Sequence, residues 1–115
     1  MQINLLVIRT SNPKELSSFY ERLGMAFQYH RHGNGPMHYS AEFGGLVFEI
    51  YPLLKNQEAA DHSLRLGFDV DDLEELILKL KEAQVEILQQ PIQTDWVYIS
   101  IIKDLDGRKI ELKQT

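Results

Sequence analysis

The sequence contains no cysteine, which excludes disulfide bonds and metal sites built on thiolates. Basic residues are also few: 12 Lys and Arg stand against 17 Asp and Glu, and they do not cluster. A nucleic-acid-binding protein needs a concentrated basic surface, so we expect no nucleic-acid partner. Uninterrupted aliphatic runs such as LLVI are far shorter than the roughly 20 residues of a membrane helix, so we expect no membrane partner.

The N-terminal segment MQINLLVIRTSNPKEL lacks the basic leader and long apolar stretch of a secretory signal peptide. We therefore expect a cytoplasmic protein. Hydrophobic residues make up 43% of the chain and charged residues 25%, which is typical of a globular protein and too apolar for disorder. A chain of 115 residues fits one compact domain better than two.

The predicted elements repeat in the same order along the two halves of the chain. Each half predicts a strand, a helix and then three strands. The helices are predicted to begin at the N-caps Asn12 and Asp72, each of which precedes a Glu by three residues. We therefore predict an α+β fold of two βαβββ modules within a single domain, residues 1–52 and 63–115, joined by a linker at 53–62.

The predicted hairpin of the first half aligns a carboxylate with a hydroxyl. If Gly44-Gly45 is a two-residue turn, Ser40 lies opposite Glu49. Because side chains alternate along a strand, His38 and Tyr51 share the face of Glu49.

The second half predicts a corresponding arrangement around the stretch DLDG at 104–107. If these residues form a four-residue turn, Ser100 lies opposite Glu111. Alternation then places Trp96 and Tyr98 on the face of Glu111. Aromatic walls around a few converging polar groups are typical of a small-molecule site, although packing or an oligomer contact explains the aromatic residues almost as well.

Five features together resemble the vicinal oxygen chelate superfamily: the βαβββ repeat, RTSNPKELSSFYERLGM, VFEIYP, LRLGFDVDDLEEL and DLDGRKIEL, the last being the most specific. This group includes glyoxalase I, bleomycin-resistance and fosfomycin-resistance proteins, and extradiol dioxygenases. The resemblance implies two modules that form an incomplete barrel around a cleft. It also implies a homodimer, because many members build the cleft with a second chain.

The resemblance also implies four inward positions for a divalent metal: Leu5, Glu49, Arg65 and Glu111. Only the two glutamates match, because Leu has no donor atom and Arg has no lone pair to give. Our hypothesis is that Arg65 replaces the metal by bonding one or both glutamates through its planar guanidinium.

The resemblance and the residues together imply a small-molecule-binding protein of the bleomycin-resistance type, with no metal cofactor. The expected ligand-binding residues are His38, Ser40, Tyr51, Arg65, Trp96, Tyr98 and Ser100. The alternative is a lyase or isomerase of the glyoxalase type, or a dioxygenase, that uses Ni, Zn, Mn or Fe. In that enzyme Glu49 and Glu111 would be both metal ligands and catalytic residues. A third hypothesis is a degenerate module that works through protein contacts.

Three histidines flank the glycine-rich stretch HGNGP at 32–36, and two interpretations of them stay open. His30 and His32 are either rim residues of a loop or a His-x-His pair that binds a transition metal. His38, on the face of Glu49, is either a third ligand, a general base or a pocket-lining residue.

Overall fold

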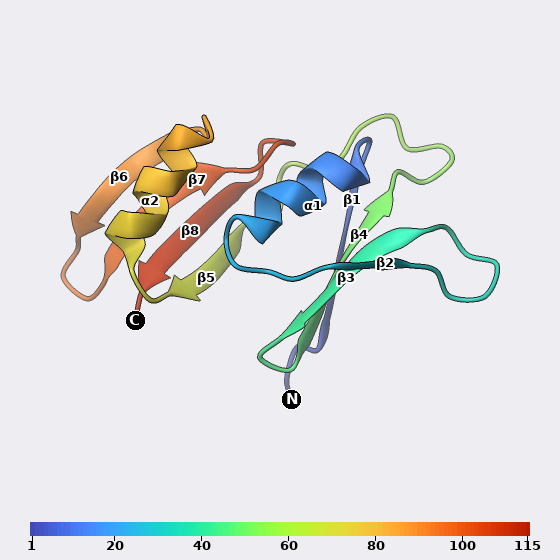
Figure 1. The fold of residues 1–115 in the computed structure, drawn as a ribbon, viewed down its shortest axis with the longest axis horizontal. Coiled ribbons are helices and arrows are strands. Elements are labelled where there is room, and N and C mark those ends of the chain that lie inside the picture. Colours follow the sequence, from blue (N-terminus) through green and yellow to red (C-terminus); the bar gives the residue numbers. More distant parts are fainter. The chain divides into compact units, whose positions relative to one another are not determined.

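The computed structural model describes residues 1–115 and divides into two compact units, Met1–Asp61 (module 1) and His62–Thr115 (module 2). Each module contains one helix and one open four-stranded sheet, in the order strand, helix, strand, strand, strand. The predicted α+β fold of two βαβββ modules is therefore confirmed (Figure 1). None of the helices has the length and apolar character needed to cross a membrane.

The sheet of module 1 is mixed and has the strand order β1-β4-β3-β2. Strand β1 runs parallel to β4, and the other neighbours are antiparallel. The elements are β1 Leu5–Thr10, α1 Pro13–Glu21, β2 Gln28–His30, β3 His38–Phe43 and β4 Leu46–Pro52. The side chain of Asn12 accepts a hydrogen bond from the backbone N–H of Glu15, which confirms the predicted N-cap of α1.

Helix α1 covers one face of the module 1 sheet. Leu16, Phe19 and Tyr20 of this helix are buried, and the Tyr20 ring lies 5.0 Å from the ring of Phe48 on β4. Ile50 shares the face of Phe48 and is also buried. Because strand side chains alternate, Glu49 and Tyr51 project from the opposite face, which α1 does not cover. We call this second face the helix-free face.

Module 2 repeats the arrangement with the strand order β5-β8-β7-β6. Its elements are β5 Leu66–Val70, α2 Leu73–Glu82, β6 Ile87–Gln93, β7 Tyr98–Lys103 and β8 Lys109–Gln114. Asp72 caps α2 by accepting from the backbone N–H of Glu75, as predicted. The core of this module joins the helix to β7 and β8 through Leu73, Ile77, Leu80, Ile102, Ile110 and Leu112.

The two predicted hairpin registers had different outcomes. In module 1, Phe43 pairs with Leu46 and Ser40 lies opposite Glu49, as predicted. In module 2, the predicted pairing of Ser100 with Glu111 is wrong: Ser100 pairs with Leu112. A shift of one residue moves a side chain to the other face of a sheet, so Ser100 lies on the helix-covered side.

The reason for the shifted register lies in the turn at 104–108. Lys103 pairs with Lys109, so Arg108 belongs to the turn and the loop is one residue longer than predicted. The Asp104 carboxylate accepts hydrogen bonds from the backbone N–H groups of Asp106 and Arg108. The guanidinium of Arg108 is buried against the carboxylates of Asp104 and Asp106, at 3.1 and 3.0 Å. These contacts hold Arg108 inside the turn.

Candidate functional site

A row of stacked side chains crosses the helix-free face of module 1 from β1 to β2. Arg9 pairs with Tyr51, and its guanidinium carbon lies 5.0 Å from the centre of the Tyr51 ring. The other face of that ring stacks on His38, with centroids 4.1 Å apart and planes within 8° of parallel. His38 in turn pairs with His30, whose ring meets it edge-on at 4.7 Å. The row therefore fixes the plane of the His38 imidazole from both sides.

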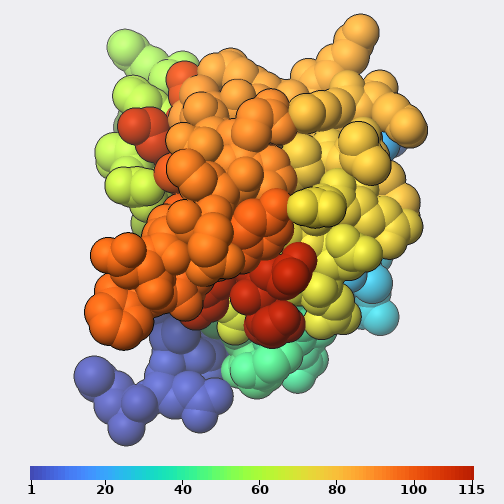
Figure 2. All heavy atoms as spheres, turned by 90° about the vertical axis from the view of Figure 1, so that its left-hand side faces the viewer, coloured from blue at the N-terminus to red at the C-terminus, as the bar shows by residue number.

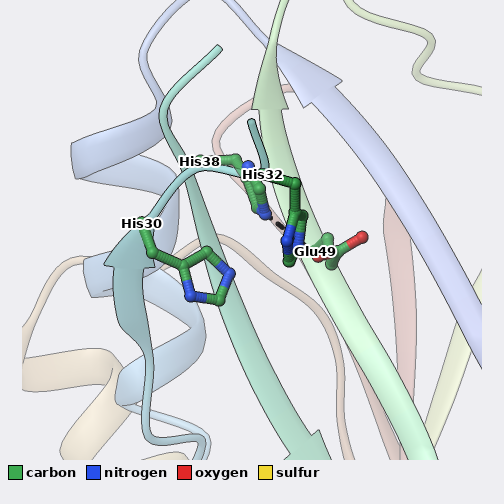
Figure 3. A group of neighbouring side chains, drawn as sticks. All are labelled: His30, His32, His38 and Glu49. Carbon is green, nitrogen blue, oxygen red and sulfur yellow. Dashed lines mark ion pairs between the residues drawn. The ribbon is translucent and has the colours of Figure 1, made fainter. Parts of the chain in front are cut away.

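Glu49 lies beside this row and is almost fully buried, with 8% of its surface exposed. Its Oε2 atom lies 3.1 Å from Nε2 of His38 and 3.9 Å from Nε2 of His32. His32 belongs to the loop between β2 and β3, and its side chain is 70% exposed. Figure 3 shows the four side chains gathered at one place, with His30 coming from β2 and Glu49 from β4. We call His30, His32, His38 and Glu49 the histidine–glutamate cluster.

Electrostatics keep the phenol of Tyr51 neutral next to this cluster. Desolvation raises the pKa of Tyr51 above its usual value, and the negative charge of Glu49 raises it further. The positive charge of Arg9 opposes both effects. Tyr51 therefore keeps its hydroxyl proton at physiological pH and can donate a hydrogen bond from this face.

Two grooves on the modules are lined by residues other than those of the histidine–glutamate cluster. One, of about 610 Å³, lies at the start of α1 and is lined chiefly by Tyr29, Tyr39, Met37 and prolines. The other, of about 350 Å³, lies between α2 and the β6–β7 hairpin and includes Tyr98. The cluster differs from both grooves in bringing donor atoms of three imidazoles and a carboxylate within 4.8 Å of one another.

The residues predicted to share the face of Glu111 lie elsewhere in module 2. Tyr98 is on the helix-covered side, where its hydroxyl donates to Glu74 of α2 at 2.7 Å, and this hydrogen bond raises the pKa of Tyr98. Ser100 is buried on that side and donates to the backbone carbonyl of Gln89. Trp96 is 91% exposed in the connection between β6 and β7. That connection forms part of the orange protrusion in Figure 2.

The face of Glu111 in module 2 is instead shared by aliphatic and basic side chains. Glu111 pairs with Ile101 across the hairpin. Lys109 and Lys113 stand two residues before and after Glu111 on β8, so they project from the same face. Arg65 precedes β5, is exposed and forms no ion pair with Glu111. The part of the hypothesis in which Arg65 bonds Glu111 is therefore wrong, and a bond from Arg65 to Glu49 stays a prediction. Leu5, the other mismatched position, is the exposed first residue of β1.

Sequence reasoning placed His38, Ser40, Glu49 and Tyr51 together, and the structure confirms that they share one face. It left open whether His30 and His32 take part, and it missed Arg9. The signal for His30 was its position opposite His38 if the strands on either side of HGNGP form a hairpin. Arg9 stands two residues after Val7, which pairs with Glu49, so alternation along β1 places Arg9 on the face of Glu49.

Comparisons with known proteins agree with the fold and the repeat. No curated protein matches the chain. Among solved structures, an integron cassette protein of V. cholerae, VCH_CASS1, is 23% identical, with a TM-score of 0.76 over 99% of this chain and 94% of that chain. TnmS3, an antibiotic binding protein from Streptomyces sp. CB03234, is 22% identical, with a TM-score of 0.77 over 99% and 95%.

A family model confirms the resemblance identified from the sequence. The model of the Glyoxalase/Bleomycin resistance protein/Dioxygenase superfamily matches residues 2–112, almost the whole chain. The chain therefore belongs to the Glyoxalase/Bleomycin resistance protein/Dioxygenase superfamily.

Proposed function

We propose that this protein binds a small organic molecule on the helix-free face of module 1. The observation that carries the proposal is the convergence of Glu49, Ser40 and Tyr51 on a face that α1 leaves uncovered. A ligand there would meet the half-buried Ser40 and Tyr51 and the small exposed part of the Glu49 carboxylate, beside aromatic rings. A few convergent polar groups among aromatic side chains are typical of small-molecule sites.

The chemistry of this face favours a ligand that presents hydrogen-bond donors. Glu49 is an acceptor when ionised, and hydrogen bonds to a charged group are stronger than those between neutral groups. Both faces of the Tyr51 ring are already occupied, by Arg9 and His38, so the ring edge and the hydroxyl remain for the ligand. The similarity to TnmS3, an antibiotic binding protein, makes antibiotics rich in hydroxyl and amino groups the first class to test.

The test is a thermal-shift screen of the tag-free protein against a panel of antibiotics that includes bleomycin, run in EDTA so that metal ions do not contribute. Hits are then measured by calorimetry on the wild type and on Glu49→Gln. We expect Glu49→Gln to weaken binding at least about 10-fold, because it replaces a charged acceptor with a neutral amide.

The matched control is Tyr29→Ala, which changes an exposed aromatic residue beside the larger groove. We expect this variant to bind as the wild type does. A panel with no hit, or hits that need Tyr29 and tolerate Glu49→Gln, would contradict the proposal. The homodimer and the alternative lyase or isomerase stay predictions from the resemblance, and the cytoplasmic location stays a prediction from the sequence.

A further inference from the structure

We infer that the histidine–glutamate cluster is a binding site for a divalent transition metal, built within module 1 alone. The site shares Glu49 with the proposed small-molecule site, but the two are tested separately, because the ligand screen is run in EDTA and the metal titration without the ligand. It shares Glu49 with the four positions that the family resemblance points to, but its three histidines occupy none of the others. It therefore needs neither Leu5 nor Arg65 nor Glu111.

The donor atoms of the cluster lie close enough together to bind one ion. One donor atom from each of the four residues lies within 4.8 Å of all the others. The three imidazole rings form a nearly regular triangle, with centroid distances of 4.7, 5.0 and 5.0 Å. Ligands about 2.0–2.2 Å from a tetrahedral ion lie about 3.4 Å from one another. The distance of 3.1 Å between Nε2 of His38 and Oε2 of Glu49 already meets this requirement. The remaining distances between donor atoms, all within 4.8 Å, would have to shorten by a small side-chain movement.

The tautomer of neutral His38 directs a lone pair at Glu49. Its Nδ1 atom lies 3.2 Å from the carbonyl oxygen of Pro36. A carbonyl oxygen can only accept, so Nδ1 carries the proton. In the neutral ring Nε2 is then a bare lone pair 3.1 Å from a carboxylate oxygen of Glu49, which is a repulsive contact. A cation between the two atoms turns that repulsion into attraction.

Two buried ring nitrogens of the cluster form no hydrogen bond, Nε2 of His30 and Nε2 of His38. The only charged group beside Nε2 of His38 at hydrogen-bond distance is the Glu49 carboxylate, 3.1 Å away. Buried polar atoms without partners are rare and costly. A proton on His38 would relieve its contact with Glu49 but would leave His30 unsatisfied. One metal ion would satisfy both nitrogens and the carboxylate.

The surrounding residues orient the cluster as supporting residues do in known metal sites. A metal-binding histidine usually donates its other ring N–H to a carbonyl or carboxylate, as His38 does to Pro36. Tyr51 fixes the ring plane of His38 by stacking. His32 lies on the exposed loop before Gly33, so it can move to close the site. The cluster thus combines three ligands held on strands β2, β3 and β4 with one ligand, His32, on an exposed loop.

The ligand chemistry indicates which ions would bind. Three imidazoles and one carboxylate suit Zn²⁺, Ni²⁺, Co²⁺ or Fe²⁺, whereas Mg²⁺ and Ca²⁺ prefer oxygen ligands. The neutral imidazoles and the single negative charge of Glu49 leave the bound ion with a net positive charge. Such an ion could take an anionic or carbonyl oxygen only as a fifth ligand, or in place of the exposed His32.

The test is titration of the tag-free, EDTA-stripped protein with Zn²⁺ in competition with a chromogenic chelator, with Mg²⁺ as the comparison ion. Substitution by Co²⁺ reports the coordination geometry through its visible absorption. We expect one tight Zn²⁺ site per chain and no tight Mg²⁺ site. We expect His38→Ala and Glu49→Gln each to weaken Zn²⁺ binding at least about 100-fold. His32→Ala, at an exposed position, should weaken it at least about 10-fold without affecting folding.

Two variants serve as controls for the location of the site. His62→Ala removes the fourth histidine of the chain, and Glu111→Gln removes the carboxylate expected from the family pattern. Neither should change the affinity for Zn²⁺. The inference is overturned if Zn²⁺ does not bind stoichiometrically, if His32→Ala and Glu49→Gln bind it as the wild type does, or if Glu111→Gln abolishes binding.

Discussion

Asp104→Ala is expected to lower the free energy of unfolding by about 3–5 kcal/mol, because it removes one partner of a buried ion pair. The Asp104 side chain is fully buried, and that of Arg108 is only 1% exposed. The carboxylate accepts from the Arg108 guanidinium at 3.1 Å and from two backbone N–H groups of the turn. Its loss removes the acceptor of the two backbone N–H groups and leaves the buried guanidinium with one fewer carboxylate, although its contact with Asp106 at 3.0 Å remains. Urea unfolding followed by far-ultraviolet circular dichroism measures the change.

Asp69→Ala is the matched control for this prediction. Asp69 also pairs with a basic residue in module 2, Lys113 at 3.5 Å, but its side chain is 63% exposed. An exposed pair contributes about 0–1 kcal/mol, so this variant should unfold close to the wild type. Equal, small losses for the two variants would show that the Asp104–Arg108 pair does not stabilise the turn as described.

Tyr51→Ala is expected to weaken Zn²⁺ binding about 10–100-fold, although Tyr51 is not one of the proposed ligands. The ring of Tyr51 stacks on His38 at 4.1 Å and holds the imidazole in the plane that aims Nε2 at Glu49. Without the ring, His38 gains rotational freedom that binding must then remove. The chelator competition assay used for the metal site measures the change in affinity.

Tyr51→Phe distinguishes the stacking from the hydroxyl group. This variant keeps the ring between Arg9 and His38, so its affinity for Zn²⁺ should stay close to that of the wild type. Rescue by Phe would identify Tyr51 as a positioning residue. If the Tyr51→Ala variant binds Zn²⁺ as tightly as the wild type, the stack does not orient the site. If the Tyr51→Phe variant binds as weakly as Tyr51→Ala, the hydroxyl group and not the ring is responsible.

The sequence predicted the first hairpin correctly and the second incorrectly, for a physical reason. Gly44 and Gly45 both have positive φ values, of 55° and 78°, and such a pair specifies a two-residue turn. The register of Ser40 and Glu49 followed from that local signal. In the second hairpin the turn also includes Arg108, whose burial against Asp104 and Asp106 is a tertiary feature that local spacing does not show.

The histidine–glutamate cluster was only partly predictable for a similar reason. Alternation along β3 and β4 placed His38 beside Glu49, because that inference needs only the hairpin turn. His30 and His32 join them through the pairing of β2 with β3 across the glycine-rich loop. That pairing has no short turn to specify it, so the sequence left both histidines as alternatives. Arg65 failed as a neutraliser of Glu111 because it lies exposed before β5 begins.

The most direct test of the central claim, a metal site on the helix-free face of module 1, is anomalous X-ray diffraction from crystals grown with Zn²⁺. Data collected on both sides of the zinc absorption edge locate the ion without reference to activity. The account predicts an anomalous peak about 2.0–2.2 Å from Nε2 of His38 and from a carboxylate oxygen of Glu49, with His30 and His32 closing around it. A zinc peak at Glu111, or none at the histidine–glutamate cluster, would contradict it.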